Sequence, residues 1–279
     1  MYTDIGAGPV AEAEYHDWYD HEHGPARLKV PGLVRACRYQ ALDGLTPRWL
    51  ALYELESPAV LDSAEYQAVV AGGSDREKFI MSHLAALDRR IYTQLSDDGL
   101  DAGDPAPVIM AVANTVPSQN VDDMTAWYEQ EHIPMLLEVP GWRRIRRYRL
   151  TGPAPLSEPG PSFLSLHELA GPSVLEEPGY RATLGTPWRD WIVSGALRRE
   201  RRVLGFRNSF YWTLLDLPRV IYHRPGGPRV PDRGHAYRQA ELPVPRRASA
   251  GRAGLVHPRR RHRGLQHGQG HGQGPLPGP

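Results

Sequence analysis

Apolar residues recur along the first 212 residues in two ways, with a period of two that is typical of strands and a period of about 3.6 that is typical of helices. The second part of this region shows the pattern most clearly. Residues 108–116 (VIMAVANTV) have the length and composition of a strand, and a helical spacing follows over residues 121–139 until Pro140-Gly141 ends it. The pattern then predicts strands over residues 142–150, 162–169 and 203–212, with a helical region from 172 to about 199 that is interrupted near 185–187.

The N-terminal part has the same order of elements. Its pattern predicts a helix over residues 11–30, strands over 33–41 and 49–55, helical segments over 58–71 and 75–86, and a last strand over 88–94. Both parts follow a β-α-β-β-α-β order, which is the ferredoxin-like split pattern. The opening strand is shortened in the first copy because Met1 aligns with Met110. A short central strand leaves backbone groups unpaired, so we expect the natural start of the chain to lie upstream.

A repeated phrase supports the division into two parts. When the chain is offset by 109 residues, WYDHEHGPARLKVPGLVRACRY (residues 18–39) aligns with WYEQEHIPMLLEVPGWRRIRRY (residues 127–148), and 12 of 22 positions are identical. Each unit would form a four-stranded antiparallel sheet with helices on one face, which leaves an apolar face to be covered. We therefore predict an α+β protein in which residues 1–95 and 107–213 are ferredoxin-like repeats, joined by a linker at 96–106. The two sheets would pack together as an intramolecular α/β barrel, with a pocket in each half.

The net charge of +1 conceals two regions of different composition. From Leu217 onward the chain has 12 arginines, no lysine and two acidic residues, whereas residues 1–216 have 21 basic and 30 acidic residues. A segment so basic and so rich in proline and glycine cannot bury enough surface to offset its ordering entropy, so we predict a disordered tail over residues 214–279. An arm for nucleic acid, a histidine-rich metal tract and the product of a shifted reading frame are alternative explanations of this tail. No aromatic residue accompanies the arginine run, so we do not expect a nucleic acid partner.

Several common classes of protein lack support in the sequence. It has no apolar run of about 18 residues and no secretory signal pattern, so we expect a soluble, cytoplasmic protein that does not bind a membrane. Cys37 has no second cysteine to pair with, and we interpret it as a small strand residue. Nucleotide-binding and nucleophile-elbow motifs are absent. We therefore expect no bound cofactor.

Each copy of the repeated phrase contains a histidine, His23 or His132, that is suited to proton transfer. Residues three apart share a helix face, so Asp20 can reach His23 and Glu129 can reach His132. A carboxylate in that position orients the imidazole and raises its basicity, as a general base requires. A proline two residues later favours a helix break, and exposed carbonyl groups there would keep the histidine pKa near neutrality. A purely structural role for both histidines remains the alternative.

Residues on the strands add further candidates. Tyr39 and Tyr148, at matching positions, can each offer a phenol to a cavity or simply pack in the sheet. Glu54 and Glu168 also match, and we expect them to form ion pairs with Arg38 or Arg147 on the neighbouring strands.

The first copy also carries His16, Asp20 and His23 on one helical stripe, which has the residue types of a divalent metal site. The second copy has Thr125, Glu129 and His132 at the corresponding positions. Because the stripe is not repeated, we expect no metal site.

The phrase W-Y-x-x-E-H-x-P followed by V-P-G and a strand ending in Arg-Tyr resembles the EthD-like branch of the dimeric α/β-barrel superfamily. The resemblance covers residues 1 to about 212 in two copies. Members of this superfamily include cofactor-independent monooxygenases, lactone isomerases, dehydratases of polyketide-like aromatics and haem-degrading enzymes. The resemblance implies that His23, His132, Tyr39 and Tyr148 are the candidates for proton transfer.

Our working hypothesis is an enzyme that acts on a small, hydrophobic, oxygenated ring compound by isomerisation, dehydration or cofactor-free oxygenation. In it His132, and also His23, would act as general base, oriented by Glu129 or Asp20, while Tyr148 or Tyr39 polarises a substrate carbonyl. A binding or accessory protein of the same fold, and a haem-binding protein, are the alternatives. The repeats would form a pseudo-dimer within one chain, and further oligomerisation is open.

Overall fold

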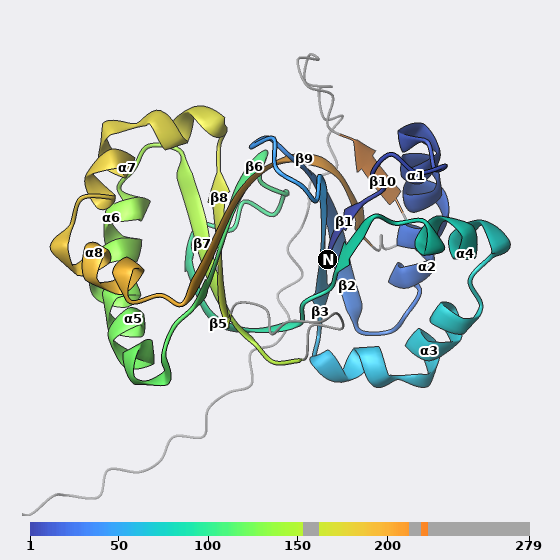
Figure 1. The fold of residues 1–279 in the computed structure, drawn as a ribbon, viewed down its shortest axis with the longest axis horizontal. Coiled ribbons are helices and arrows are strands. Elements are labelled where there is room, and N and C mark those ends of the chain that lie inside the picture. Colours follow the sequence, from blue (N-terminus) through green and yellow to red (C-terminus); the bar gives the residue numbers. More distant parts are fainter. Residues whose placement is uncertain (153–161, 212–218, 223–279) are drawn as a thin grey trace, which may run out of the picture. The chain divides into compact units, whose positions relative to one another are not determined.

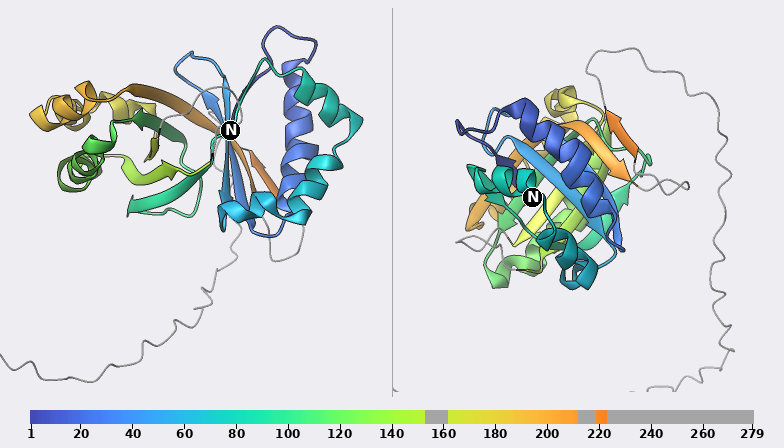
Figure 2. Two further views of the ribbon diagram at one scale, coloured as in Figure 1. Left: turned by 60° about the horizontal axis from the view of Figure 1, so that its bottom comes forward. Right: turned by 90° about the vertical axis from the view of Figure 1, so that its right-hand side faces the viewer.

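The computed structural model describes residues 1–152, 162–211 and 219–222 (Figure 1). The described residues form one antiparallel sheet of ten strands, with helices along the outer faces of both halves (Figures 1 and 2). No helix in this part of the chain is long and apolar enough to cross a membrane.

The N-terminal half, which we define as β1 to β4, has the strand order β4-β1-β3-β2. This is the order expected for the ferredoxin-like split pattern. Its strands are β1 (Tyr2–Asp4), β2 (Leu33–Ala41), β3 (Trp49–Leu55) and β4 (Ala86–Asp88), and its helices are α1 (Glu12–Trp18), η1 (Tyr19–His23), α2 (Gly24–Leu28), η2 (Pro58–Asp62), α3 (Ala64–Ala71) and α4 (Asp75–Ser82).

The C-terminal half, which we define as β6 to β9, repeats the arrangement with the order β9-β6-β8-β7. Its strands are β6 (Val108–Thr115), β7 (Trp142–Leu150), β8 (Phe163–Leu169) and β9 (Arg198–Tyr211), and its helices are η3 (Ser118–Asn120), α5 (Val121–Trp127), η4 (Tyr128–His132), α6 (Ile133–Leu137), η5 (Pro172–Glu176), α7 (Pro178–Thr183) and α8 (Pro187–Ser194). The predicted strands over 33–41, 49–55 and 142–150 have the bounds that the structure shows.

Two strands link the halves: β9, the last strand of the C-terminal half, also pairs with β2, and β5 (Tyr92–Gly99), which follows the N-terminal half, pairs with β7. The 14-residue β9 pairs with β6 along its first part and with β2 along its second part. After β4 the chain continues through three residues into β5. Strands β4 and β5 thus follow one another in sequence but stand at opposite ends of the sheet order.

Two predictions about the ends of elements need correction. Strand β5 continues to Gly99, into the segment predicted as a linker from residue 96. Residues Arg219–Tyr222, predicted as part of a disordered tail, form β10 and pair with β9. The rest of the tail lies outside the described residues.

The helix break predicted after each histidine is absent. The repeated phrase forms a π-helical turn in both halves, η1 and η4, and the helix continues through it into α2 and α6. A backbone N–H bond from Gly24 to the carbonyl of Tyr19 closes the first of these turns. The following proline stands directly after the wider π-helical turn, and the helix continues through it.

The buried side chains gather in three clusters. One cluster lies under the helices of the N-terminal half and includes Trp18, Trp49 and Phe210. A second lies under the helices of the C-terminal half, and a third lies on the opposite face of the strands and joins Cys37 to Ile109. Burial raises the pKa of the Cys37 thiol to about 11, which fits a packing residue.

A candidate ligand cavity in the N-terminal half

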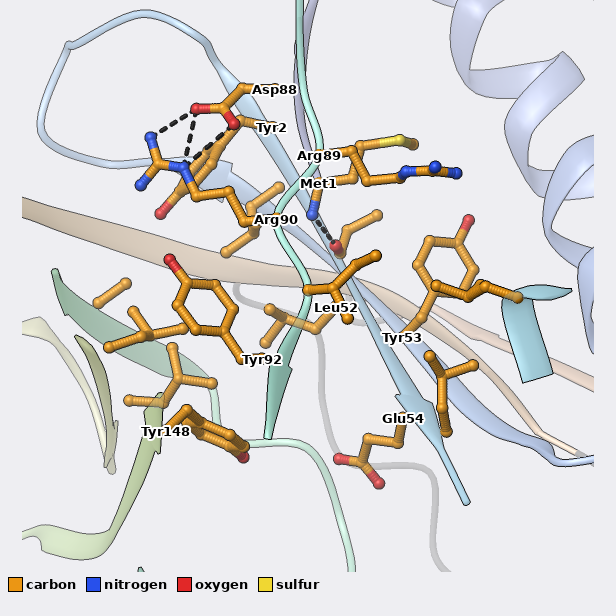
Figure 3. A pocket seen from close by; sticks show the side chains of 18 of the residues that line it. Met1, Tyr2, Leu52, Tyr53, Glu54, Asp88, Arg89, Arg90, Tyr92 and Tyr148 are labelled. Carbon is orange, nitrogen blue, oxygen red and sulfur yellow. Dashed lines mark hydrogen bonds and ion pairs between the residues drawn. The ribbon is translucent and has the colours of Figure 1, made fainter. Parts of the chain in front are cut away.

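A cavity of about 700 Å³ opens along β3 and the segment that joins β4 to β5 (Figure 3). Strand β1 pairs with Trp49 and Leu50 of β3, and Met1 forms two backbone hydrogen bonds with the next residue of β3, Ala51. Strand β6 of the other half is eight residues long and pairs along all of β8. The cavity is lined by residues from both faces of the sheet.

On the helix side the cavity is lined by His23 and Arg27, next to Glu77 of α4. The Nδ1 atom of His23 lies 3.4 Å from Oε1 of Glu77, and Nη2 of Arg27 donates to the same oxygen at 2.6 Å. All three side chains are more than nine-tenths buried. The contact with His23, and then the charge of Arg27, lower the pKa of Glu77 to about 2. Burial lowers the pKa of His23, against the opposing effect of Glu77.

These shifts leave Glu77 ionised and His23 neutral near pH 7. A neutral imidazole next to a carboxylate carries its proton on the nitrogen that faces the carboxylate, which here is Nδ1. The Nε2 atom then has a free lone pair. Glu77, rather than the predicted Asp20, is the acid that faces His23. The 3.4 Å contact is an ion-pair distance, and Nδ1 is buried without a hydrogen-bond partner.

Asp20, the predicted partner of His23, contacts other groups. It accepts hydrogen bonds from Arg38 and from Asn208 of β9, and Arg38 also donates to Nδ1 of His16. The π-helical turn contributes to this difference, because a wider turn places residues three apart less directly above one another. His16 and Asp20 thus both accept hydrogen bonds from Arg38. The described residues contain no group of three potential metal ligands.

Two tyrosines extend the helix-side wall of the cavity. The hydroxyl groups of Tyr19 and Tyr53 share a hydrogen bond of 2.5 Å, and Tyr53 lines the cavity. Burial raises the pKa of Tyr53 to about 12. At neutral pH this phenol is protonated and able to donate a hydrogen bond to a ligand oxygen.

On the other face of the sheet the cavity is lined by Tyr148 and Glu54 (Figure 3). The predicted ion pairs of Glu54 and Glu168 with Arg38 or Arg147 are wrong, since both acids pair with Arg146 instead, at 3.0 and 2.8 Å. Alternate residues of a strand point to opposite faces. Arg38 and Arg147 lie over tyrosine rings of the helices, so neither can reach acids on the other face.

The same alternation separates the predicted histidine and tyrosine pairs. Tyr39 is buried against Phe206, with ring centroids 5.7 Å apart, and does not line the cavity. Tyr148 lies on the opposite face of its sheet from His132. The structure instead brings His23 of one half and Tyr148 of the other to the same cavity.

His132 has different surroundings. It lines a void of only about 30 Å³, and its ring stacks on Trp127 at a centroid distance of 4.2 Å. Its predicted partner Glu129 is exposed, and no carboxylate of the described residues forms an ion pair with His132. Burial, followed by the charges of Arg189 and Arg199, lowers the pKa of His132 to about 3. The expectation of a pKa near neutrality is therefore wrong for this histidine.

Sequence reasoning missed Glu77 and Arg27. Glu77 lies more than 50 residues from His23 in sequence, on a helix that carries no recognisable motif. Its counterpart in the C-terminal half falls in a helical region with different residues, so the comparison of the two copies does not mark it. Only the packing of α4 against the first helix brings the carboxylate to the imidazole.

Comparison with protein-family models and with curated sequences finds no match. The structure is similar to that of an anthrone oxidase-like protein, with a TM-score of 0.52 and 13% sequence identity, over 75% of this chain and 89% of that chain. Weaker similarity, with a TM-score of 0.40 and 10% identity, relates it to a candidate monooxygenase from Lactobacillus acidophilus, over 77% of this chain and 95% of that one.

A ferredoxin-fold protein from Listeria monocytogenes, related to antibiotic biosynthesis monooxygenases, has a TM-score of 0.36 and 9% identity over 64% of this chain and 97% of that one. At such identities the likeness bears on fold alone. Together with the strand order of each half, the similarity to the anthrone oxidase-like protein identifies a ferredoxin-like α/β fold.

Proposed function

We propose that this chain is a tandem duplication of an EthD-like unit, whose halves pair as an intramolecular α/β barrel, and that it acts on a small, hydrophobic, oxygenated ring compound. The matching strand orders and the exchanged strands β5 and β9 support the pseudo-dimer. The observation that carries the function is the pair His23–Glu77 at the wall of a 700 Å³ cavity, a size that suits an aromatic or polyketide-like compound.

In the proposed mechanism, Nε2 of His23 removes a proton from a carbon or hydroxyl group of the ligand. Glu77 holds the ring and stabilises the imidazolium that forms. The phenol of Tyr53, or that of Tyr148 from the other face, donates a hydrogen bond to the oxygen on which negative charge develops. Such a proton transfer can start an isomerisation, a dehydration or a cofactor-free oxygenation.

The chain supplies its own control for this assignment. His23→Gln and His132→Gln remove equivalent histidines of the two halves, but only His23 lines the large cavity. The wild-type protein and the two variants should be incubated with a panel of hydroxylated polycyclic aromatics and unsaturated lactones, and the products followed by mass spectrometry. We expect His23→Gln to lose turnover by about a hundredfold or more and His132→Gln to keep it, because general-base catalysis contributes factors of that order.

Glu77→Gln keeps the shape of the side chain and removes the charge, so it should lower turnover with less effect on ligand binding. Loss of turnover in His132→Gln with full activity in His23→Gln would contradict the assignment. Ligands that bind but return unaltered in every variant would support the accessory-protein alternative instead.

A further inference from the structure

Arg89 differs from the other arginines of the cavity. It follows β4 and lines the cavity (Figure 3). It donates a hydrogen bond to the hydroxyl group of Tyr66 at 3.1 Å. No carboxylate of the described residues forms an ion pair with it. Its neighbour Arg90 pairs with Asp88 at 2.5 Å and with Glu200 at 2.6 Å.

The remaining arginines on the sheet side of the cavity are also neutralised. Each has at least one acidic partner: Arg144 pairs with Asp97 and Asp101, Arg146 with Glu54 and Glu168, and Arg202 with Asp43. A guanidinium group taken partly out of water without a partner is unfavourable, since its lost hydration is not replaced. Within the described part of the chain, Arg89 is therefore the arginine of the cavity wall that has no carboxylate partner.

Arg27 adds unused donors on the same wall. Its Nη2 atom binds Glu77, but its Nη1 atom is buried without a hydrogen-bond partner, and the residue is only 8% exposed. On the helix side, Arg27 and Arg89 thus line the cavity, and of the described carboxylates Glu77 is the one that pairs with Arg27. His23 is neutral there, so one positive charge is left over.

We propose that the ligand of this cavity is an anion, an organic acid whose carboxylate accepts hydrogen bonds from Arg89 and Tyr66 while its ring occupies the apolar part of the cavity. Arginine matches a carboxylate with two parallel donors, and such charge-assisted bonds are about twice as strong as neutral ones. The inference rests on the proposed function and adds the charge of the ligand to it. It also orients the ligand, with its acidic end toward the segment between β4 and β5 and its ring toward Leu52 and Leu166.

Isothermal titration calorimetry at pH 7 with two small-molecule probes tests this inference separately from the proposed function. The probes are a naphthalene carboxylic acid, ionised at pH 7, and the naphthalene carboxamide of the same shape. We expect the full chain to bind the acid about tenfold or more tighter than the amide, because a hydrogen bond to a charged group contributes more than one to a neutral group. Arg89→Gln should remove this preference and leave the affinity for the amide unchanged.

Arg149→Gln is the matched control, since it removes the same charge from an exposed residue that does not line the cavity. Arg89→Lys should restore part of the preference for the acid. Equal binding of acid and amide, or an unchanged preference in Arg89→Gln with an unchanged melting temperature, would overturn the inference and leave the cavity function standing. Failure of both probes to bind the wild-type protein would count against the proposed function as well.

Discussion

The two halves of the chain share a strand order and a repeated phrase, but they stabilise the arginine under the helix in different ways. Arg38 of the N-terminal half pairs with Asp20, donates to His16, and lies over the ring of Tyr19 at 4.0 Å. The matching Arg147 lies over Tyr128 at 4.3 Å and forms no ion pair with any described residue. Burial lowers the pKa of Arg147.

Part of the difference lies in the copies themselves, since Thr125 stands where the first copy has His16, and part lies in the strand beside each half. Strand β9 carries Asn208 to Asp20 and places Phe210 in the core under the N-terminal helices. In the C-terminal half β5 occupies the corresponding place, and Asp98 lies opposite Ile145 as Phe210 lies opposite Ala36. A copied motif thus diverges when its neighbours diverge. Identical residues in two repeats are not evidence of identical chemistry.

The largest contrast is expected from the acids that precede the two histidines. Asp20→Ala leaves Arg38 buried without its carboxylate and should lower the free energy of unfolding by about 3–5 kcal/mol. Glu129→Ala at the matching position removes an exposed side chain and should change it by less than about 0.5 kcal/mol. Urea denaturation followed by circular dichroism measures both. Equal losses in the two variants would show that the halves do not differ in this way.

Replacing Gly24, the small residue of the repeated phrase, tests how closely the Phe210 ring packs against the helix. A Cβ atom on Gly24 would lie 2.9 Å from the Phe210 ring, whereas the matching Ile133 is a buried core residue. Gly24→Ile should therefore destabilise the protein by about 3 kcal/mol through overpacking. In a Phe210→Ala background the same substitution should cost much less, since the space is then free. Additive losses in the double variant would rule out the ring as the cause.

A smaller effect should separate the two histidines by pH. The pKa of His132 is about 3 in the folded protein against an ordinary value of 6.5, so the unfolded chain binds more protons between these values. Stability from this group is complete above pH 6.5 and declines as the pH falls toward 3. Between pH 7 and pH 5 it should contribute a loss of about 2 kcal/mol, which His132→Gln should abolish.

His23→Gln should change this pH dependence less, because Glu77 opposes the lowering of the His23 pKa. Thermal denaturation at pH 5 and pH 7 compares the two variants directly. If His23→Gln reduced the pH dependence of stability more than His132→Gln did, the two environments would be assigned to the wrong histidines.

Local pattern was sufficient for much of the fold. The bounds of β2, β3 and β7 follow from alternation and from the prolines and glycines that flank them, and the 109-residue repeat pointed to two units of the same order. The π-helical turn could not be predicted from the sequence, because over five residues an apolar period of 3.6 cannot be distinguished from the slightly longer period of a π-helix. For the same reason the short-range pairing of Asp20 with His23 was a plausible but mistaken inference.

The sequence by itself indicated most of the helices and strands, their order in the chain and the repeated phrase, because these depend on residues close together in the chain. Only the tertiary structure decided which histidine lines the large cavity, which acid faces His23, and which arginine of the described cavity wall has no acidic partner. Those outcomes depend on contacts between segments 50 or more residues apart, such as Arg27 with Glu77 and Arg146 with Glu54. Burial and partner choice at such distances are properties of the packed molecule, where removal of water makes each charge depend on its nearest neighbours.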